Sequence, residues 1–297
     1  MAAIDIGSNS VRCLVVNIIP TPEYTHYKKV SMTRLPVRLG QDVFVNGKVG
    51  KEVGGRLLDA MRAFEAIMRV NGVMHYRACA TSAMREARNG ERWLKKIRKR
   101  TGIDLELING KEEARLLLKA KLFDKIQPSA DNLLFIDVGG GSTELSFYRD
   151  GEFHTSRSFK IGSVRLMNAA DVEKEWQEME AWIAKHRAEI PGDLEMVGSG
   201  GNINRIHKHS RQAVSEPLTL SYLNKQYKAL KLMSQGDMVL NLDFNIDRAD
   251  VVVHALKIYR RAMRWADVTT IYVPRIGVSD GIIRDLYHRE LRDIYES

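Results

Sequence analysis

The 297-residue sequence predicts an α/β fold built from two similar halves. Strand patterns and amphipathic helix patterns are mixed along the whole chain, and this order restarts near residue 133. A short motif also recurs, because Ile4–Ser10 resembles Ile136–Ser142 at an offset of 132 residues. A length near 300 gives room for about two domains of roughly 150 residues. We expect a first domain over residues 1–124 and a second over 125–297, with the boundary in a Pro- and Ser-containing loop.

The first half opens with two predicted strands, Ala2–Ile6 and Val11–Ile19, joined by a Gly-Ser-Asn-Ser turn. Residues 53–70 predict a helix, since their apolar side chains recur at spacings of three and four. The remaining elements are a strand at Met74–Ala80, a helix at Glu91–Arg100, a strand at Leu105–Ile108 and a helix at Lys111–Ile126.

The second half opens with three predicted strands, at Leu133–Val138, Thr143–Tyr148 and Glu152–Lys160. The elements that follow are a helix at Asp171–Ala188, a strand entering a Gly turn at 198–201, a helix at Arg248–Trp265, a strand at Thr270–Val273 and a helix at Asp280–Tyr295. This last helix, about 280–296, is a candidate to pack back on the first domain.

Composition excludes several classes of protein. Hydrophobic residues make up 44% and charged residues 28%, which is typical of a globular chain rather than a disordered or collagen-like one. No apolar run is long enough to span a membrane, and Asp5 interrupts the one candidate signal-peptide core. We therefore expect a cytoplasmic protein with no membrane partner. The two cysteines fit a reducing compartment, and no spacing among the eight histidines predicts a transition-metal site.

The charge balance is the unusual feature, with 46 Lys and Arg against 37 Asp and Glu, a net charge of +9. Such a surplus favours an anionic partner, which leaves nucleic acid, a membrane surface or polyphosphate open. The basic stretches do not alternate with aromatic residues as a nucleic-acid stacking surface would. We expect part of the charge at 85–100 and 205–211 to border the substrate site.

The two copies of the repeated motif are the strongest candidates for a binding site. Each lies between two apolar strands, so each is predicted to be the turn of a β-hairpin. A turn rich in Gly and Ser can direct several backbone N–H groups at one anion, and a phosphate is the usual occupant. A plain hairpin turn is the alternative, and the two copies in register favour the phosphate site. The candidate phosphate ligands are Gly7, Ser8, Asn9, Ser10, Gly139, Gly140, Gly141, Ser142 and Thr143.

Acidic residues beside these loops point to a metal. Asp5 and Asp137 lie where each strand enters its turn, and a carboxylate next to phosphate requires a cation such as Mg²⁺, or another divalent ion. Glu144 follows the second loop and could face either solvent or the site. Glu113 opens a helix, where it could complement the helix dipole or act as a general base for water. Arg85 could clamp a phosphate or lie on the surface.

Six ordered motifs, taken together, resemble the exopolyphosphatase / guanosine pentaphosphate phosphatase family of the actin-like, sugar-kinase-like and Hsp70-like ATPase superfamily. The motifs are Asp5–Ser10, Ala80–Asn89, Ile108–Arg115, Asp137–Glu144, Ile161–Leu166 and Gly198–Gly201. The resemblance implies two ribonuclease-H-like domains around an interdomain cleft. The implied reaction is Mg²⁺-dependent release of a terminal phosphate from inorganic polyphosphate or guanosine pentaphosphate.

The resemblance also implies roles for individual residues. Glu113 would be the catalytic base, and Glu144 would be a second catalytic residue that helps to hold Mg²⁺ or the attacking water. Asp5, Asp137 and Glu144 would hold the metal, while Arg85, Gly200, Gly201 and the two loops would bind phosphate. The chain resembles the short, two-domain members, and a homodimer is one possible assembly. A nucleic-acid partner is not expected.

Two departures from the family pattern leave the substrate open. Ser279 and Asp280 stand where many members have Arg and Glu, and Asn202 stands where Thr is common. Three other functions stay open on separate grounds: an actin-like ATPase, a small-molecule kinase, and a sensor that binds guanosine tetra- or pentaphosphate or polyphosphate without hydrolysing it.

Overall fold

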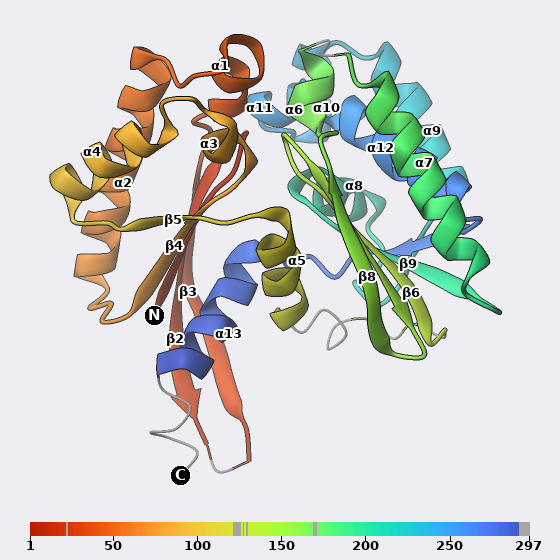
Figure 1. Cartoon of the computed structure of the whole chain (residues 1–297), viewed down its shortest axis with the longest axis horizontal. Coiled ribbons are helices and arrows are strands. Elements are labelled where there is room, and N and C mark those ends of the chain that lie inside the picture. The colour runs from red at the N-terminus through yellow and green to blue at the C-terminus, as the bar shows by residue number, and fades with distance from the viewer. Residues whose placement is uncertain (22, 121–125, 127, 129, 169–170, 291–297) are drawn as a thin grey trace. The chain divides into compact units, whose positions relative to one another are not determined.

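The computed structural model describes residues 1–21, 23–120, 126, 128, 130–168 and 171–290. The chain divides into two compact units (Figure 1). Unit 1 combines Met1–Lys121 with Gly277–Ser297, and unit 2 is Leu122–Ile276. Unit 2 is thus inserted between the two segments of unit 1, and the last described helix belongs to unit 1.

Unit 1 is built on a five-stranded sheet with the order β3-β2-β1-β4-β5. The strands β1 (Ala2–Ile6), β2 (Val11–Pro20) and β3 (Thr25–Leu35) are antiparallel neighbours. The strands β4 (Tyr76–Ala80) and β5 (Leu105–Leu107) continue the sheet parallel to β1. The sequence did not predict β3, because its largely exposed side chains give no apolar pattern.

Helices cover both faces of this sheet (Figure 1). The helices α2 (Lys51–Val70) and α4 (Gly90–Thr101) pack together on one face, where Leu57, Met61 and Phe64 are buried. On the other face, α13 (Val278–Glu290) packs against β1, β2, β4 and α5 (Gly110–Lys119). Two short helices, α1 (Leu39–Asn46) and α3 (Ser82–Glu86), complete the unit. The predicted extensions of α5 through residues 121–125 and of α13 beyond residue 290 lie outside the described residues.

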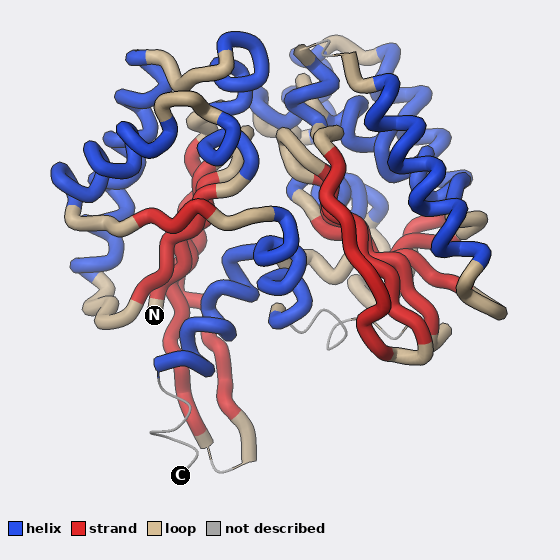
Figure 2. The backbone as a smooth tube through the Cα atoms, viewed as in Figure 1, coloured by secondary structure: helices blue, strands red, loops and turns tan. Residues whose placement is uncertain are grey.

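Unit 2 repeats the topology of unit 1 in a six-stranded sheet, with the order β10-β11-β9-β6-β7-β8 (Figure 2). The three predicted strands are confirmed as the antiparallel series β6 (Asn132–Val138), β7 (Thr143–Arg149) and β8 (Glu152–Phe159). The strand β9 (Leu194–Ser199) is parallel to β6, as β4 is to β1. The strands β11 (Thr270–Tyr272) and β10 (Leu218–Thr219) lie beyond β9. The internal repeat of the sequence is therefore a repeat of this hairpin-plus-parallel-strand arrangement.

Seven described helices accompany the second sheet: α6 (Ser163–Met167), α7 (Glu173–Ala188), α8 (Gly201–Ser210), α9 (Leu220–Leu232), α10 (Gln235–Leu242), α11 (Ile246–Ala249) and α12 (Val252–Trp265). The buried helix α12 contacts β6 and five of the other helices, α6, α7, α8, α9 and α11. The prediction of one helix from Arg248 was wrong at its start, because the chain turns at Asp250 and Val251 between α11 and α12. Within the described residues, no helix has the length and apolar character needed to cross a membrane.

Candidate functional site

The two repeated motifs form turns with the same backbone hydrogen bond. The amide of Gly7 donates to the carbonyl of Ser10 over 3.1 Å, and the amide of Gly139 donates to the carbonyl of Ser142 over 3.0 Å. A Cβ on either glycine would lie 3.2 Å from that same carbonyl oxygen. The predicted hairpin turns are thus confirmed, and the tight turn explains why both begin with glycine.

The first loop, Gly7–Ser10, is held from the side by other parts of unit 1. Its carbonyl oxygens at Ser8 and Asn9 accept hydrogen bonds from the amides of Gly40 (2.7 Å) and Arg38 (2.9 Å). The hydroxyl of Ser8 lies 3.1 Å from the hydroxyl of Ser82, at the start of α3. The carbonyl side of the loop is therefore occupied by its own unit.

The second loop, Gly139–Ser142, is held in the same manner by the start of α6. The amide of Ser163 donates to the carbonyl of Gly139, and those of Val164 and Arg165 donate to the carbonyl of Gly140. The Arg165 side chain adds a bond from Nε to the carbonyl of Gly141 over 2.9 Å. We call residues 161–165 the brace of the second loop.

The brace leaves the amide side of the second loop available for a ligand. Within the part of the chain that the structure describes, the N–H groups of Gly140, Gly141 and Ser142 bond to no acceptor. Adjacent backbone amides in a tight turn form a concave site for an anion. Thr143 contributes differently from the expectation, because its hydroxyl donates to the carbonyl of Ile161 over 2.6 Å and so holds the brace.

Two carboxylates lie beside the second loop. Asp137 and Glu144 are paired residues on the neighbouring strands β6 and β7, and each offers a carboxylate oxygen within 4.8 Å of the other. The hydroxyls of Ser142 and Ser158 donate to Glu144 Oε1 over 2.7 and 2.9 Å. Glu144 is only 2% exposed, so it does not face solvent. Two ordered carboxylates with oxygen-only chemistry suit a hard divalent cation such as Mg²⁺.

The equivalent position in unit 1 has a different partner. Asp5 is paired across the hairpin with Arg12, whose Nη1 donates to Asp5 Oδ2 over 3.0 Å. Burial raises the pKa of Asp5, and the charge and hydrogen bond of Arg12 oppose that rise. Arg12 occupies the place in the repeat that Glu144 occupies in unit 2. Arg12 was not among the residues expected at the site, although the 132-residue offset identifies it.

The Gly turn after β9 lies close to Asp137. A Cβ on Gly200 would come within 3.6 Å of Asp137 Oδ1, and within 2.8 Å of both the Tyr259 hydroxyl and the Val138 carbonyl. Gly200 has a φ of 127°, and α8 begins at the next residue, Gly201. The turn therefore brings the N-terminus of a ten-residue helix beside the carboxylates, where its dipole favours an anion.

Tyr259 supports this turn from the core. Its buried hydroxyl donates to the carbonyl of Ser199, and burial raises its pKa well above the ordinary tyrosine value. From the sequence we expected only a core residue of the predicted helix. Helical periodicity shows which way such a side chain points, but it does not show that the hydroxyl reaches the site.

Glu113 lies in the first turn of α5 in unit 1. Asn109 begins this helix, since its side-chain oxygen accepts from the amide of Glu112 (2.9 Å) and its carbonyl accepts from the amide of Glu113 (3.0 Å). Arg85 donates from Nη1 to the carbonyl of Ile108 over 2.5 Å. Arg85 thus fixes the segment from which α5 starts.

An ion-pair cluster attaches α13 to the same helix. The fully buried Asp285 of α13 accepts from Arg77 (2.7 Å), Arg115 (3.0 Å) and Lys119 (2.6 Å), and it forms an ion pair with Arg289 (2.9 Å). Burial alone would raise the pKa of Asp285, but the bonds from Lys119 and Arg115 hold it below the ordinary value. We call Arg77, Glu112, Arg115, Lys119 and Asp285 the α5–α13 cluster.

Glu112 and Glu113 have different surroundings although they are adjacent. Glu112 accepts from Arg115 and Arg77 over 2.6 to 3.0 Å, and the bond from Arg115 lowers its pKa. Glu113 is buried, with 8% of its surface exposed, whereas Glu112 is partly exposed.

Two of the residues that depart from the family pattern, Ser279 and Asp280, have local roles in unit 1. Asp280 Oδ2 accepts from the amide of Gly277 over 3.1 Å, and Oδ1 pairs with Lys29 over 2.5 Å. Ser279 is buried beside it at the start of α13. This pair therefore anchors the helix within unit 1.

The site residues predicted from sequence fall into two groups. The second loop, Asp137, Glu144 and Gly200–Gly201 gather in unit 2 around one position. The first loop, Asp5, Arg85 and Glu113 all belong to unit 1.

Comparisons with known proteins agree with these features. Residues 19–290 match the family model for the Ppx/GppA phosphatase family. Exopolyphosphatase 1 of Mycobacterium tuberculosis is 34% identical over 170 residues, which cover 56% of this chain and 47% of that protein. The guanosine-5'-triphosphate,3'-diphosphate pyrophosphatase of Aliivibrio fischeri is 26% identical over 311 residues, covering 98% of this chain and 60% of that protein. The chain spans about half the length of the curated relatives that it matches at 34% identity.

Solved structures show the same fold. The crystal structure of an exopolyphosphatase from Cytophaga hutchinsonii matches with a TM-score of 0.84 at 23% identity, covering 97% of each chain. The Aquifex aeolicus member of the Ppx/GppA family matches with a TM-score of 0.74 at 22% identity, covering 98% of each chain. The fold class implied by the sequence motifs is confirmed. With the family model matching from residue 19 to residue 290, the chain belongs to the Ppx/GppA phosphatase family.

Proposed function

We propose that this protein hydrolyses a terminal phosphoanhydride bond and releases phosphate from inorganic polyphosphate or guanosine pentaphosphate. Membership of the family supports this proposal, as do relatives named exopolyphosphatase and guanosine-5'-triphosphate,3'-diphosphate pyrophosphatase. The observation that carries it is the second loop, whose amides adjoin the Asp137–Glu144 pair. Amide donors and paired carboxylates together suit a phosphate with its metal.

We assign the metal to Asp137 and Glu144. Both are carboxylates, and hydroxyl groups already orient Glu144, so the donor set fits Mg²⁺. When bound, such an ion neutralises charge on the phosphoryl oxygens. Asp5 was expected as a third ligand, and its pairing with Arg12 makes it secondary to these two in our proposal. Its main role would be to fix the first loop.

Glu113 is our proposed general base. Phosphoryl transfer needs an oriented water and stabilisation of charge, and a carboxylate at a helix start can provide the first. The proposal requires unit 1 to present Glu113 and its loop to the same substrate that unit 2 binds. Arg85 donates one guanidinium N–H to the carbonyl of Ile108, and it would bind a phosphate oxygen with its other N–H groups.

The first experiment measures phosphate release with Mg²⁺ from short polyphosphate, long polyphosphate, guanosine pentaphosphate and ATP. We expect release without any acceptor, faster from polyphosphate or guanosine pentaphosphate than from ATP. Release that requires an acceptor alcohol would favour a kinase instead. Tight binding of guanosine pentaphosphate with no release would favour a sensor.

The substitution Glu113→Gln tests the catalytic assignment. We expect phosphate release to fall by at least about 100-fold, because general-base catalysis contributes roughly 10²- to 10⁴-fold. Circular dichroism and thermal unfolding should match the wild type. The matched control is Glu91→Gln, which changes an exposed acid in the first turn of α4 and should leave the rate unchanged. Full activity of the Glu113 variant would refute the assignment.

A further inference from the structure

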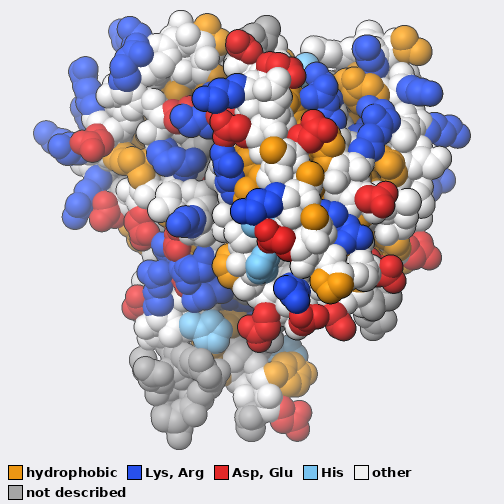
Figure 3. Space-filling model, turned by 45° about the vertical axis from the view of Figure 1, so that its right-hand side comes forward, with side chains coloured by type: hydrophobic (Ala, Val, Ile, Leu, Met, Phe, Trp, Pro, Cys, Tyr) orange, Lys and Arg blue, Asp and Glu red, His pale blue; other side chains and the backbone are white. Residues whose placement is uncertain are grey.

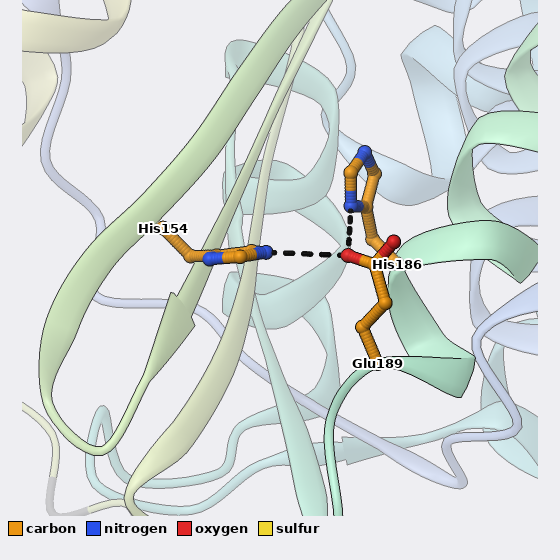
Figure 4. A group of neighbouring side chains, drawn as sticks. All are labelled: His154, His186 and Glu189. Atoms are coloured by element: carbon orange, nitrogen blue, oxygen red, sulfur yellow. Dashed lines mark hydrogen bonds and ion pairs between the residues drawn. The ribbon is translucent and has the colours of Figure 1, made fainter.

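Two histidines and a glutamate converge on the surface of unit 2 (Figure 4). His154 comes from β8, whereas His186 and Glu189 come from the C-terminal end of α7 and the residue after it. His186 Nδ1 lies 2.9 Å from Glu189 Oε2, and His154 Nε2 lies 3.4 Å from the same oxygen. We propose that these three side chains bind a Zn²⁺ ion, at a position separate from the Asp137–Glu144 pair.

The distances suit tetrahedral zinc. Zinc–nitrogen and zinc–oxygen bonds of about 2.0–2.1 Å place neighbouring ligand atoms roughly 3.3 Å apart at tetrahedral angles. The two nitrogen–oxygen separations, 2.9 and 3.4 Å, bracket that value, and the two nitrogens lie within 4.8 Å of each other. A small rotation of the imidazole rings therefore brings all three atoms into the coordination sphere of one ion, and a water completes it.

The fold positions both imidazoles. Phe147 of β7 pairs with Thr155 while Tyr148 pairs with Phe153, so His154 is the extra residue of a β-bulge in β8. Bulges often serve to redirect a side chain, and Figure 4 shows His154 extending from its strand toward α7. His186 packs edge-to-face on Trp182 with ring centroids 4.8 Å apart, and only 12% of its side chain is exposed. His186 is thus already held in place before an ion binds, which lowers the free-energy cost of ordering the site.

The chemistry of the donors selects the class of ion. Two imidazole nitrogens with one carboxylate oxygen match three-ligand zinc sites and do not suit Mg²⁺, which prefers oxygen ligands throughout. This group was not predictable from the sequence, because the two histidines are 32 positions apart and have no short ligand spacing. The ion would tie β8 to the end of α7.

The test is a Zn²⁺ titration of the full chain against a chromophoric chelator, with Mg²⁺ in excess to occupy the Asp137–Glu144 pair. We expect one equivalent to bind to the wild type and the affinity to fall at least about 10-fold in His154→Ala. His154 and Glu189 are at the surface, so His154→Ala and Glu189→Gln should fold normally. Zn²⁺ should also raise the melting temperature of the wild type and not of these variants.

The control is His209→Ala, which removes an exposed histidine of α8 and should bind Zn²⁺ as the wild type does. The Glu113→Gln variant should also keep the site, so zinc binding and phosphate release are tested independently. Equal Zn²⁺ affinity in wild type and His154→Ala, or no binding in the presence of Mg²⁺, would overturn the proposal and leave a hydrogen-bonded surface cluster.

Discussion

A single position of the internal repeat carries opposite charges in the two units. Arg12 faces Asp5 in unit 1, and Glu144 faces Asp137 in unit 2. The first pair is neutral as a whole and fixes its loop, whereas we propose that the two adjacent carboxylates of the second pair bind a cation. On that proposal, the duplicated hairpin combines one loop fixed by its own ion pair with one loop that is completed by its ligand.

Arg12→Ala should destabilise unit 1 by about 1–3 kcal/mol near pH 7, since it leaves the buried Asp5 without its ion-pair partner. Burial already raises the pKa of Asp5, and removing Arg12 raises it further. A carboxyl with a raised folded-state pKa destabilises the fold above that pKa, and the penalty disappears as the pH falls through it. The difference from wild type should thus shrink toward pH 4.

Urea denaturation near pH 7 and near pH 4.5 measures this difference. Arg69→Ala is the control, because Arg69 belongs to an exposed ion pair with Glu65 and its loss should matter little at either pH. A deficit that grows on acidification would contradict the account of Asp5.

The sequence predicted the identity of the main site residues better than their individual contacts. The repeat identifies both loops, Asp5 and Asp137 without any structure. It cannot show that the hydroxyl of Thr143 turns to Ile161 rather than to a ligand, because a rotation about one bond decides between them. The same holds for Arg85, whose long side chain reaches a backbone carbonyl 23 residues away.

Among the elements, the brace is the part of unit 2 that leaves least room for change. A Cβ on Gly162 would lie 2.4 Å from the Gly140 carbonyl oxygen and 2.5 Å from the Gly141 nitrogen. Both contacts are with backbone, so the loop itself must move to relieve them. Gly162 is therefore required for the close approach of the brace to the phosphate loop.

Gly162→Ala should lower the free energy of unfolding by about 1–3 kcal/mol. It should also lower the rate of phosphate release, since the loop amides lose their alignment. Thermal unfolding and substrate KM are the measurements. Gly55→Ala is the matched control, because a Cβ there meets nothing within 4 Å and should stabilise α2 slightly. Similar behaviour of the two variants would show that the contact is not tight.

The α5–α13 cluster should dominate the acid sensitivity of unit 1. Asp285 and Glu112 have lowered pKa values, so their stabilisation is present above the ordinary values of 3.8 and 4.5 and is lost as the pH falls below them. Asp285→Asn should cost about 1–3 kcal/mol near pH 7, since it removes the buried partner of Arg77, which keeps Glu106 and Glu112.

Denaturation of Asp285→Asn at several pH values checks this expectation. The variant should lose less stability on acidification than the wild type does. Asp59→Asn is the control, because that exposed acid pairs only with Arg62 on the surface of α2. An unchanged acid transition in Asp285→Asn would show that other groups control it.

Helices and strands with a strong apolar period were predictable, and the others were not. The helix α2 and the strands β6 and β7 follow directly from their side-chain patterns. The strand β3 was not predicted because none of its side chains is fully buried. The helices α9 and α10 were not predicted because each buries only one or two side chains. Surface elements are specified by pairing with neighbours more than by their own sequence.

For the molecule as a whole, the charge surplus belongs entirely to one unit. Unit 1 contains 26 Lys and Arg against 17 Asp and Glu, whereas unit 2 contains 20 of each. Much of the excess lies on α4, where six of the twelve residues are basic. Lys and Arg side chains are prominent along the left edge of Figure 3. Attraction of a polyanion would therefore be a property of unit 1, while unit 2, which has no net charge, would supply the loop beside the Asp137–Glu144 pair.

Lys95→Glu with Lys99→Glu should lower kcat/KM for polyphosphate about 3- to 10-fold at low ionic strength, because exposed charges on α4 would no longer steer the polyanion inward. The effect should vanish in high salt, where the screening length is only a few Å. The control pair, Lys225→Glu with Lys228→Glu on α9, makes the same change in total charge on unit 2. Equal losses from both pairs would mean that net charge alone matters.

The insertion of unit 2 has a consequence for how a ribosome makes this protein. Arg77 and Asp285 are 208 positions apart, so the whole of unit 2 is synthesised between the two partners of one buried ion pair. Unit 2 is continuous and can fold on the nascent chain as soon as it emerges. Unit 1 cannot neutralise Arg77, Arg115 and Lys119 with Asp285 until α13 follows. The N-terminal segment of unit 1 is thus translated before unit 2, and unit 1 is completed after it.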